Sequence, residues 1–253
     1  MIPDPPLLII APVADDTDLT QLPWCEAARE RLSVNRSKFE NLEMAEVVFD
    51  AMTFLVSRQT AAETGRLLAG KGSASPQGNP PCPDTPSLGI ALSDILESAR
   101  HLPAVNHRLL LLGKWIGESV SANAAAWLPS GGLSDFPDYC TSVERLLAGG
   151  PFPTAFQTWI SRAPDGHFLT RGLGYFAGQE IRLTAPAGYD LDAISARLVP
   201  VIDNIATRGR INRPARIEGM VQGEMLAFTP SDDLGRVDIV IEKSPVTGDP
   251  AKI

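Results

Sequence analysis

The sequence predicts an α+β fold in which an antiparallel β-sheet is packed with helices. Apolar and polar residues alternate over 155–160 and 237–242, which is the period of half-buried strands. Over 88–147 the apolar residues recur every three or four positions instead, as they do along one face of a helix. Both halves share a strand–helix–strand rhythm, so two related α/β sub-domains are an alternative arrangement.

The first seventy residues combine strands with short helices. The run 7–10 is continuously apolar between prolines, which suits a strand buried on both faces. A helix is expected over 24–32, and β-rich residues over 44–57 predict one or two strands. Thr60 and Glu63 have the spacing of a capping box, which indicates a short helix directly after them.

The clearest break in the chain is the segment 70–87, where 11 of 18 residues are Gly, Pro or Ser. Such a composition cannot sustain regular hydrogen bonding, so we expect a linker or a long surface loop. The predicted organisation is an N-terminal α/β segment, the linker, a C-terminal α+β domain and a tail, at residues 1–70, 71–87, 88–245 and 246–253.

Helical spacing dominates the first part of the C-terminal domain, and strand alternation dominates the rest. The expected helices cover residues 88–99, 105–120, 136–147 and 190–205. The expected strands cover residues 124–128, 155–160, 181–184 and 237–242. Asp232 and Asp233 before Gly235 predict a hairpin turn ahead of the last strand.

Charge and cysteine content restrict the class of protein. The net charge of −8 disfavours binding to nucleic acid or to anionic membranes. Cys25, Cys82 and Cys140 are an odd number of widely spaced thiols, which argues against a disulfide framework or a zinc knuckle. The N-terminus has no basic region, and its apolar run is too short for a signal peptide or a membrane span. We therefore expect a cytoplasmic protein.

Familiar catalytic and cofactor motifs are missing from the sequence. It contains no Gly-x-Ser-x-Gly elbow, no Walker loop and no His-Glu-x-x-His motif. The glycines at 172, 174 and 178 have the wrong spacing for a dinucleotide fingerprint, and they precede a predicted strand, whereas the fingerprint follows one. The sequence thus predicts no catalytic residue, no cofactor and no metal site.

The segment 170–181 is the best candidate for a site, and it allows two interpretations. In the functional one, Arg171 and Glu180 line a concave site floored by glycines. In the structural one, the glycines shape a bend and the charged residues pair locally. The speculative binding residues are Trp159, His167, Arg171, Tyr175 and Glu180, of which Trp159 and Tyr175 would form apolar walls.

The same segment resembles a bacterial family of unknown function, number four-two-six-one in the domain-of-unknown-function series. The resemblance rests on Thr-Arg-Gly-Leu, an aromatic residue and a Gly, and Glu-Ile within 170–181, and on Ala126-Trp127, Phe152-Pro153 and Trp159-Ile160. It covers about residues 100–243. Members often have Pro before the Glu, where this chain has Gln179. The family has no established activity, so the resemblance implies only that Thr170, Arg171, Gly172 and Glu180 matter to the architecture.

Three functions are compatible with the sequence. We favour a non-enzymatic binding or regulatory module for an unknown protein or small molecule, with no nucleic acid or membrane partner. An enzyme acting on a small anionic substrate near Arg171 and Glu180 is an alternative. A structural, homo-oligomeric assembly protein is another, because Val240 and Trp159 stand on otherwise polar strand faces. Arginines at 208, 210, 213 and 216 form either an anion- or partner-binding edge or a solvated helix end and loop.

Overall fold

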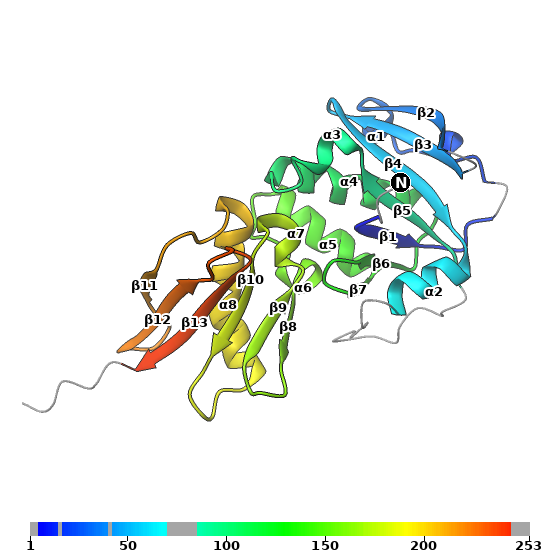
Figure 1. Ribbon diagram of the computed structural model, residues 1–253. Coiled ribbons are helices and arrows are strands. Elements are labelled where there is room, and N and C mark those ends of the chain that lie inside the picture. The colour runs from blue at the N-terminus through cyan, green and yellow to red at the C-terminus, as the bar shows by residue number, and fades with distance from the viewer. Residues whose placement is uncertain (1–4, 15–16, 40–41, 70–84, 244–253) are drawn as a thin grey trace, which may run out of the picture. The chain divides into compact units, whose positions relative to one another are not determined.

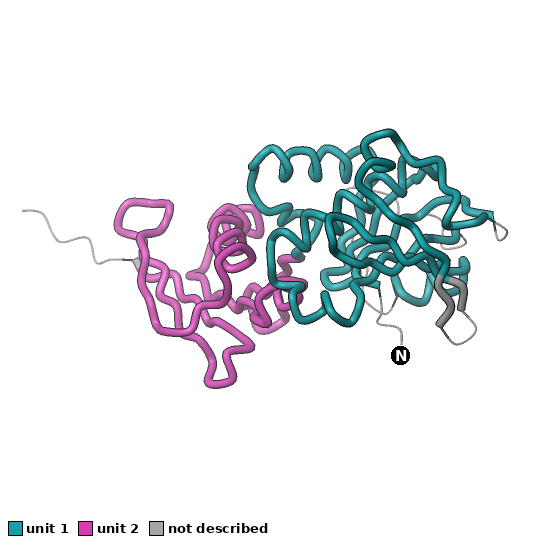
Figure 2. Tube along the Cα trace, turned by 90° about the horizontal axis from the view of Figure 1, so that it is seen from above, with its two compact units in different colours: residues 1–158 teal, residues 159–253 magenta. Residues whose placement is uncertain are grey.

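The computed structural model describes residues 5–14, 17–39, 42–69 and 85–243 (Figure 1). The chain divides into two compact units, Met1–Thr158 and Trp159–Ile253 (Figure 2). This boundary differs from the division that the sequence placed at 71–87. Strands from before and after that segment pair within one sheet, which explains the difference. Cys82 and the 246–253 tail lie outside the described residues.

Unit 1 is built on a seven-stranded antiparallel sheet with the order β2-β3-β4-β5-β1-β6-β7. Its strands are β1 Leu7–Ile10, β2 Leu32–Phe39, β3 Leu42–Phe49, β4 Met52–Gln59, β5 Ser87–Leu92, β6 Ala124–Trp127 and β7 Gly132–Asp135. Its helices are η1 Leu19–Gln21, α1 Glu26–Arg29, α2 Ala61–Ala69, α3 Asp94–Glu97, α4 Pro103–Ser119, α5 Phe136–Leu147 and α6 Thr154–Gln157.

The core of unit 1 is centred on β1, whose four residues are all buried, as the apolar run predicts. Leu8 and Ile10 face a cluster that includes residues of α2, whereas Leu7 faces α4. Close approach on that side depends on Gly113 of α4, where an added Cβ would lie 2.6 Å from Leu7 Cδ2. Helices therefore cover both faces of the middle of the sheet.

One predicted helix is wrong. Residues 88–99 carry apolar residues at helical spacing, but Ser87–Leu92 forms β5, and only Asp94–Glu97 is helical. β5 pairs with β4 on one side and β1 on the other, and all six of its residues are buried. A strand buried on both faces has no alternation, so its apolar residues matched the helical period by coincidence.

Unit 2 is built on a six-stranded mixed sheet with the order β11-β12-β13-β10-β9-β8. Its strands are β8 Trp159–Arg162, β9 Phe168–Arg171, β10 Glu180–Thr184, β11 Ala215–Glu218, β12 Glu224–Pro230 and β13 Arg236–Lys243. Its helices are α7 Leu173–Ala177 and α8 Leu191–Arg208. The strand expected at 155–160 is displaced, because α6 occupies 154–157 and β8 begins at Trp159.

One face of this second sheet is covered by α8, which Figure 1 shows behind the strands. Ile194, Leu198 and Ile202 of the helix are fully buried, as are Leu183 of β10 and Ile239 of β13. Among the described residues, α7 contacts α8, and the side chains on the other face of the sheet are exposed or half-buried, so neither helix of unit 2 covers that face. β10 and β13 are parallel, whereas every strand pair of unit 1 is antiparallel. The topologies therefore give no support to two related sub-domains.

Candidate functional site

The segment singled out by the sequence forms the connection β9–α7–β10. The chain leaves β9 through Gly172, whose φ of +100° is in the left-handed region that favours glycine. Glu180, the first residue of β10, turns its carboxylate onto this connection. Its Oε1 accepts hydrogen bonds from the N–H groups of Gly172 and Gly174, each at 2.8 Å. Its Oε2 accepts a hydrogen bond from Thr170 Oγ1 at 2.6 Å.

Thr170 links this carboxylate to the sheet. Its hydroxyl oxygen accepts the N–H of Ile181 at 2.8 Å, so a side chain replaces a main-chain acceptor where the two strands diverge. Gly174 fits closely as well, because an added Cβ would lie 3.1 Å from Glu180 Oε1. Thr170, Gly172, Gly174, Glu180 and Ile181 thus form one hydrogen-bonded unit, called here the Glu180 clasp. The clasp gives the motif a structural role.

Three other predicted site residues lie at the same end of the sheet. Trp159 of β8 is directly opposite Arg171 of β9, and Tyr175 belongs to α7, where its ring packs edge-on against Phe176 at 5.1 Å. All three are half-buried. The structure therefore groups Trp159, Arg171, Tyr175 and Glu180, but the carboxylate of this group is already engaged by internal donors.

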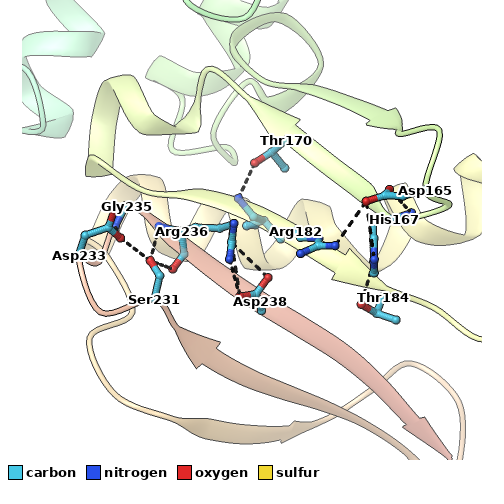
Figure 3. Close-up of polar contacts among 11 residues, drawn as sticks. Asp165, His167, Thr170, Arg182, Thr184, Ser231, Asp233, Gly235, Arg236 and Asp238 are labelled. Atoms are coloured by element: carbon cyan, nitrogen blue, oxygen red, sulfur yellow. Dashed lines mark hydrogen bonds and ion pairs between the residues drawn. The ribbon is translucent and has the colours of Figure 1, made fainter.

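His167 lies at the other end of these strands, in the turn before β9 (Figure 3). Its Nδ1 is 3.0 Å from Thr184 Oγ1, and its Nε2 is 3.9 Å from Asp165 Oδ2. Thr184 and Glu180 are the two ends of β10, so about 13 Å of strand separates His167 from the clasp. His167 does not converge with Glu180 in one site.

A row of paired charges crosses the uncovered face of the unit 2 sheet (Figure 3). Arg182 of β10 lies 3.4 Å from Asp165, and its register partner on β13 is Asp238. Asp238 in turn lies 3.2 Å from Arg236 of the same strand. Positive and negative groups alternate along this row, so the face carries no strong field of one sign.

The hairpin between β12 and β13, which comes just before Arg236 at the end of this row, is stabilised by side-chain hydrogen bonds. Ser231 Oγ donates to Asp233 Oδ1 at 2.6 Å, and the Gly235 N–H donates to the same oxygen at 2.9 Å. Both hydrogen bonds lower the pKa of Asp233, and the one from the Ser231 hydroxyl has the larger effect. The predicted turn at Asp232 and Asp233 is therefore confirmed.

Gln179, the residue before Glu180, is fully buried, and both its amide nitrogen and its amide oxygen are hydrogen-bonded. Its amide nitrogen donates to the carbonyls of Ile211 at 3.0 Å and Leu234 at 3.2 Å. Its amide oxygen accepts the Ile211 N–H at 2.9 Å. A single side chain thus fastens the loop after α8 and the β12–β13 hairpin to the start of β10.

Sequence reasoning missed the strongest polar network of unit 2. Arg197 of α8 donates two hydrogen bonds of 2.8 Å to the carboxylate of Glu224 on β12. The Tyr189 hydroxyl and the Met220 N–H donate to the same carboxylate at 3.0 and 3.1 Å. Hydrogen bonds from Arg197 are the main reason why the pKa of Glu224 is lowered. This pair could have been found from the sequence, because Arg197 is a lone charged residue on the apolar face of a predicted helix, and a buried Arg requires an acidic partner.

The arginines at 208, 210, 213 and 216 are exposed. Arg208 ends α8, where a cation complements the helix dipole, and Arg216 lies 3.3 Å from Glu242 of β13. In the described part of the chain no cluster of His, Cys, Asp and Glu could hold a metal ion. A helix long and apolar enough to cross a membrane is likewise missing from those residues.

No protein-family model, curated protein or solved structure matches the chain.

Proposed function

We propose that the chain is a binding or regulatory module, and that it recognises a protein partner with the uncovered face of the unit 2 sheet. The observation that carries the proposal is the exposure of apolar side chains on this face. Leu169 of β9 is 36 % exposed and Val240 of β13 is 42 % exposed. On a sheet whose other face is packed against α8, these side chains offer apolar contacts that a partner molecule can cover.

The polar surroundings of these residues favour a protein as the partner. Leu169 is opposite Arg182, and Val240 is opposite Thr184, so each apolar residue adjoins a polar one. Apolar positions bordered by polar and charged residues are the usual anatomy of a protein–protein interface. The paired charges and the overall charge of −8 both argue against a polyanion on this face.

The alternative of an enzyme for a small anionic substrate has less support. It requires Arg171, Glu180 and His167 to converge in one pocket. The carboxylate of Glu180 accepts three internal hydrogen bonds, and His167 lies at the far end of β10. Among the described residues, therefore, Arg171, Glu180 and His167 do not form the single pocket that this alternative requires.

The setting of the module is part of the proposal. We place it in the cytoplasm because three widely spaced cysteines suit a reducing compartment. The likeness to a bacterial family of unknown function remains a hypothesis about origin. The Glu180 clasp supplies a physical reason why its Thr, Gly and Glu positions would occur together.

Site-specific photo-crosslinking in cells tests the proposed surface. A photoreactive amino acid at position 240 should give an adduct with a partner of defined mass. The matched control is position 199 on α8, where Val199 is 38 % exposed on the opposite layer of the same unit. The adduct at 240 should be lost when Leu169 is replaced by Asp. Equal labelling from 240 and 199, or an adduct that survives Leu169→Asp, would contradict the assignment of this face.

A further inference from the structure

The outer edge of the unit 2 sheet is formed by β11, Ala215–Glu218, whose only strand neighbour in the described chain is β12. All four residues of β11 are exposed, and Ile217 is 46 % exposed. An edge strand presents unpaired N–H and C=O groups to any strand that can lie beside it. We propose that β11 pairs antiparallel with β11 of a second copy, so that the chain forms a two-fold symmetric dimer with a continuous sheet.

The register within unit 2 determines which residues offer their main chain to the partner. The Gly219 N–H donates to Glu224 O at 2.8 Å, so Gly219 points its main chain at β12. Main-chain groups of successive residues point to opposite sides of a strand. Ile217, aligned with Leu226, therefore also bonds toward β12, whereas Arg216 and Glu218 direct their N–H and C=O groups to the free edge.

The side chains of Arg216 and Glu218 favour one symmetric register. If Ile217 of both copies lies on the two-fold axis, Arg216 of each copy is opposite Glu218 of the other. Each such pair exchanges both main-chain hydrogen bonds, and opposite charges directly across strands are stabilising. Moving the axis by one residue would place Arg216 opposite Arg216 or Glu218 opposite Glu218, which is unfavourable. The strand is therefore self-complementary in a single register.

Two further features fit this pairing. The Ile217 side chains meet across the axis as the closer, non-hydrogen-bonded type of pair, on the face of the sheet that α8 covers. Pro214 precedes the strand and has no N–H to offer, while the Met220 N–H already donates to Glu224 Oε1. The pairing is thus limited to the five residues 215–219. The contact between Arg216 and Glu242 lies on the opposite, uncovered face of the sheet. It is highly exposed, so it is weak and does not prevent the new pairing.

Charge exchange in the full-length chain tests this dimer, with sedimentation velocity over a wide range of protein concentration. The wild type should shift from monomer to dimer as concentration rises. Arg216→Glu and Glu218→Arg should each remain monomeric, because each places like charges opposite one another. The double exchange R216E/E218R should dimerise again, and an equal mixture of the two single variants should form a heterodimer. Both positions are exposed, so all variants are expected to fold, and circular dichroism checks that they do.

The proposal is overturned if the wild type is monomeric at every concentration, in which case β11 is free for a strand from another protein. It is equally overturned if the single variants dimerise as the wild type does, because the contact then lies elsewhere. Failure of both the double exchange and the mixture to dimerise would rule out the register centred on Ile217.

Discussion

Replacing Glu224 by Gln should destabilise unit 2 by about 3 kcal/mol. The side chain of Glu224 is 3 % exposed and that of Arg197 is 9 % exposed, so the substitution leaves a buried guanidinium without its counter-charge. The usual penalty for breaking a buried pair is about 3–5 kcal/mol. We take the lower end because Arg197 keeps a 2.8 Å hydrogen bond to Ala193 O and its position 4.8 Å from the Tyr189 ring centroid.

Hydrogen–deuterium exchange measured by mass spectrometry can assign this loss to one unit. A change of about 3 kcal/mol corresponds to about 150-fold lower protection of the slowest amides of β10, β12 and β13. Amides of β4 and β5 in unit 1 serve as the internal reference. The control Asp238→Asn breaks the exposed pair with Arg236, which should change stability by less than about 0.5 kcal/mol. A loss of protection in Glu224→Gln no larger than that in Asp238→Asn would refute the stabilising role of the buried pair.

The contribution of Glu224 should also depend on pH in a defined direction. Because the pKa of Glu224 is lowered in the folded chain from its ordinary value of 4.5, the unfolded chain binds more protons as the medium becomes acidic. The stabilisation is complete above that ordinary value and is lost as the pH falls through the folded pKa. The difference in protection between wild type and Glu224→Gln should therefore shrink in acid, and a difference that grows would contradict this assignment.

Three more predictions concern two buried side chains and one half-buried thiol. Thr170→Val removes the hydroxyl that accepts the Ile181 N–H, so unit 2 should lose about 1–3 kcal/mol in urea unfolding, whereas Thr184→Val at the exposed end of β10 should be nearly neutral. Gln179→Leu strands the Ile211 N–H, and exchange in the loop after α8 should rise; unchanged exchange would show that water replaces the amide. Burial raises the pKa of the Cys140 thiol to about 11, so iodoacetamide should label it far more slowly than the exposed Cys25, and equal rates in peptide mapping would be inconsistent with that shift.

Elements with local signals were predictable from the sequence. The capping box forms as expected, with Thr60 N and Oγ1 donating to Glu63 Oε2 and the Glu63 N–H donating to Thr60 Oγ1. Asp190 caps α8 by accepting the Ala193 N–H at 2.8 Å. In each case the residue that begins the element bonds to a group three residues away, so a single sequence contains both partners.

Elements whose identity depends on distant partners were not predictable. β5 is a strand because β1 and β4 lie on either side of it, and residues 7–10 and 52–59 supply those neighbours. β2 was missed for a related reason, since it is an edge strand whose only strand neighbour in the described chain is β3, and its side chains at 32–36 are exposed or half-buried. Pairing over long sequence separations overrides local periodicity in both places.

Part of the hydrogen-bonded arrangement around Glu180 was predictable from the sequence. The sequence brought attention to Thr170, Gly172 and Glu180, and the structure joins these three residues, with Gly174 and Ile181, in the Glu180 clasp. The sequence also grouped His167 with them because it is near in sequence. His167 comes just before β9, however, and Glu180 begins β10, which runs antiparallel to β9. Nearness along the chain is a poor guide in an antiparallel pair, because residues close to the start of one strand face the end of the next.

In unit 2 the Glu180 clasp has a structural role, whereas the uncovered sheet face is the proposed binding surface. Every donor to Glu180 is internal, so substitutions in the clasp should alter stability and leave a binding surface unchanged. Val240 and Leu169 are exposed, so substitutions there should leave stability nearly constant and, under the proposed function, weaken binding of the partner. A motif built on Thr170, Gly172 and Glu180 therefore identifies an architecture. Whether two chains with this motif also have the same function depends on the residues of the uncovered sheet face and of the β11 edge.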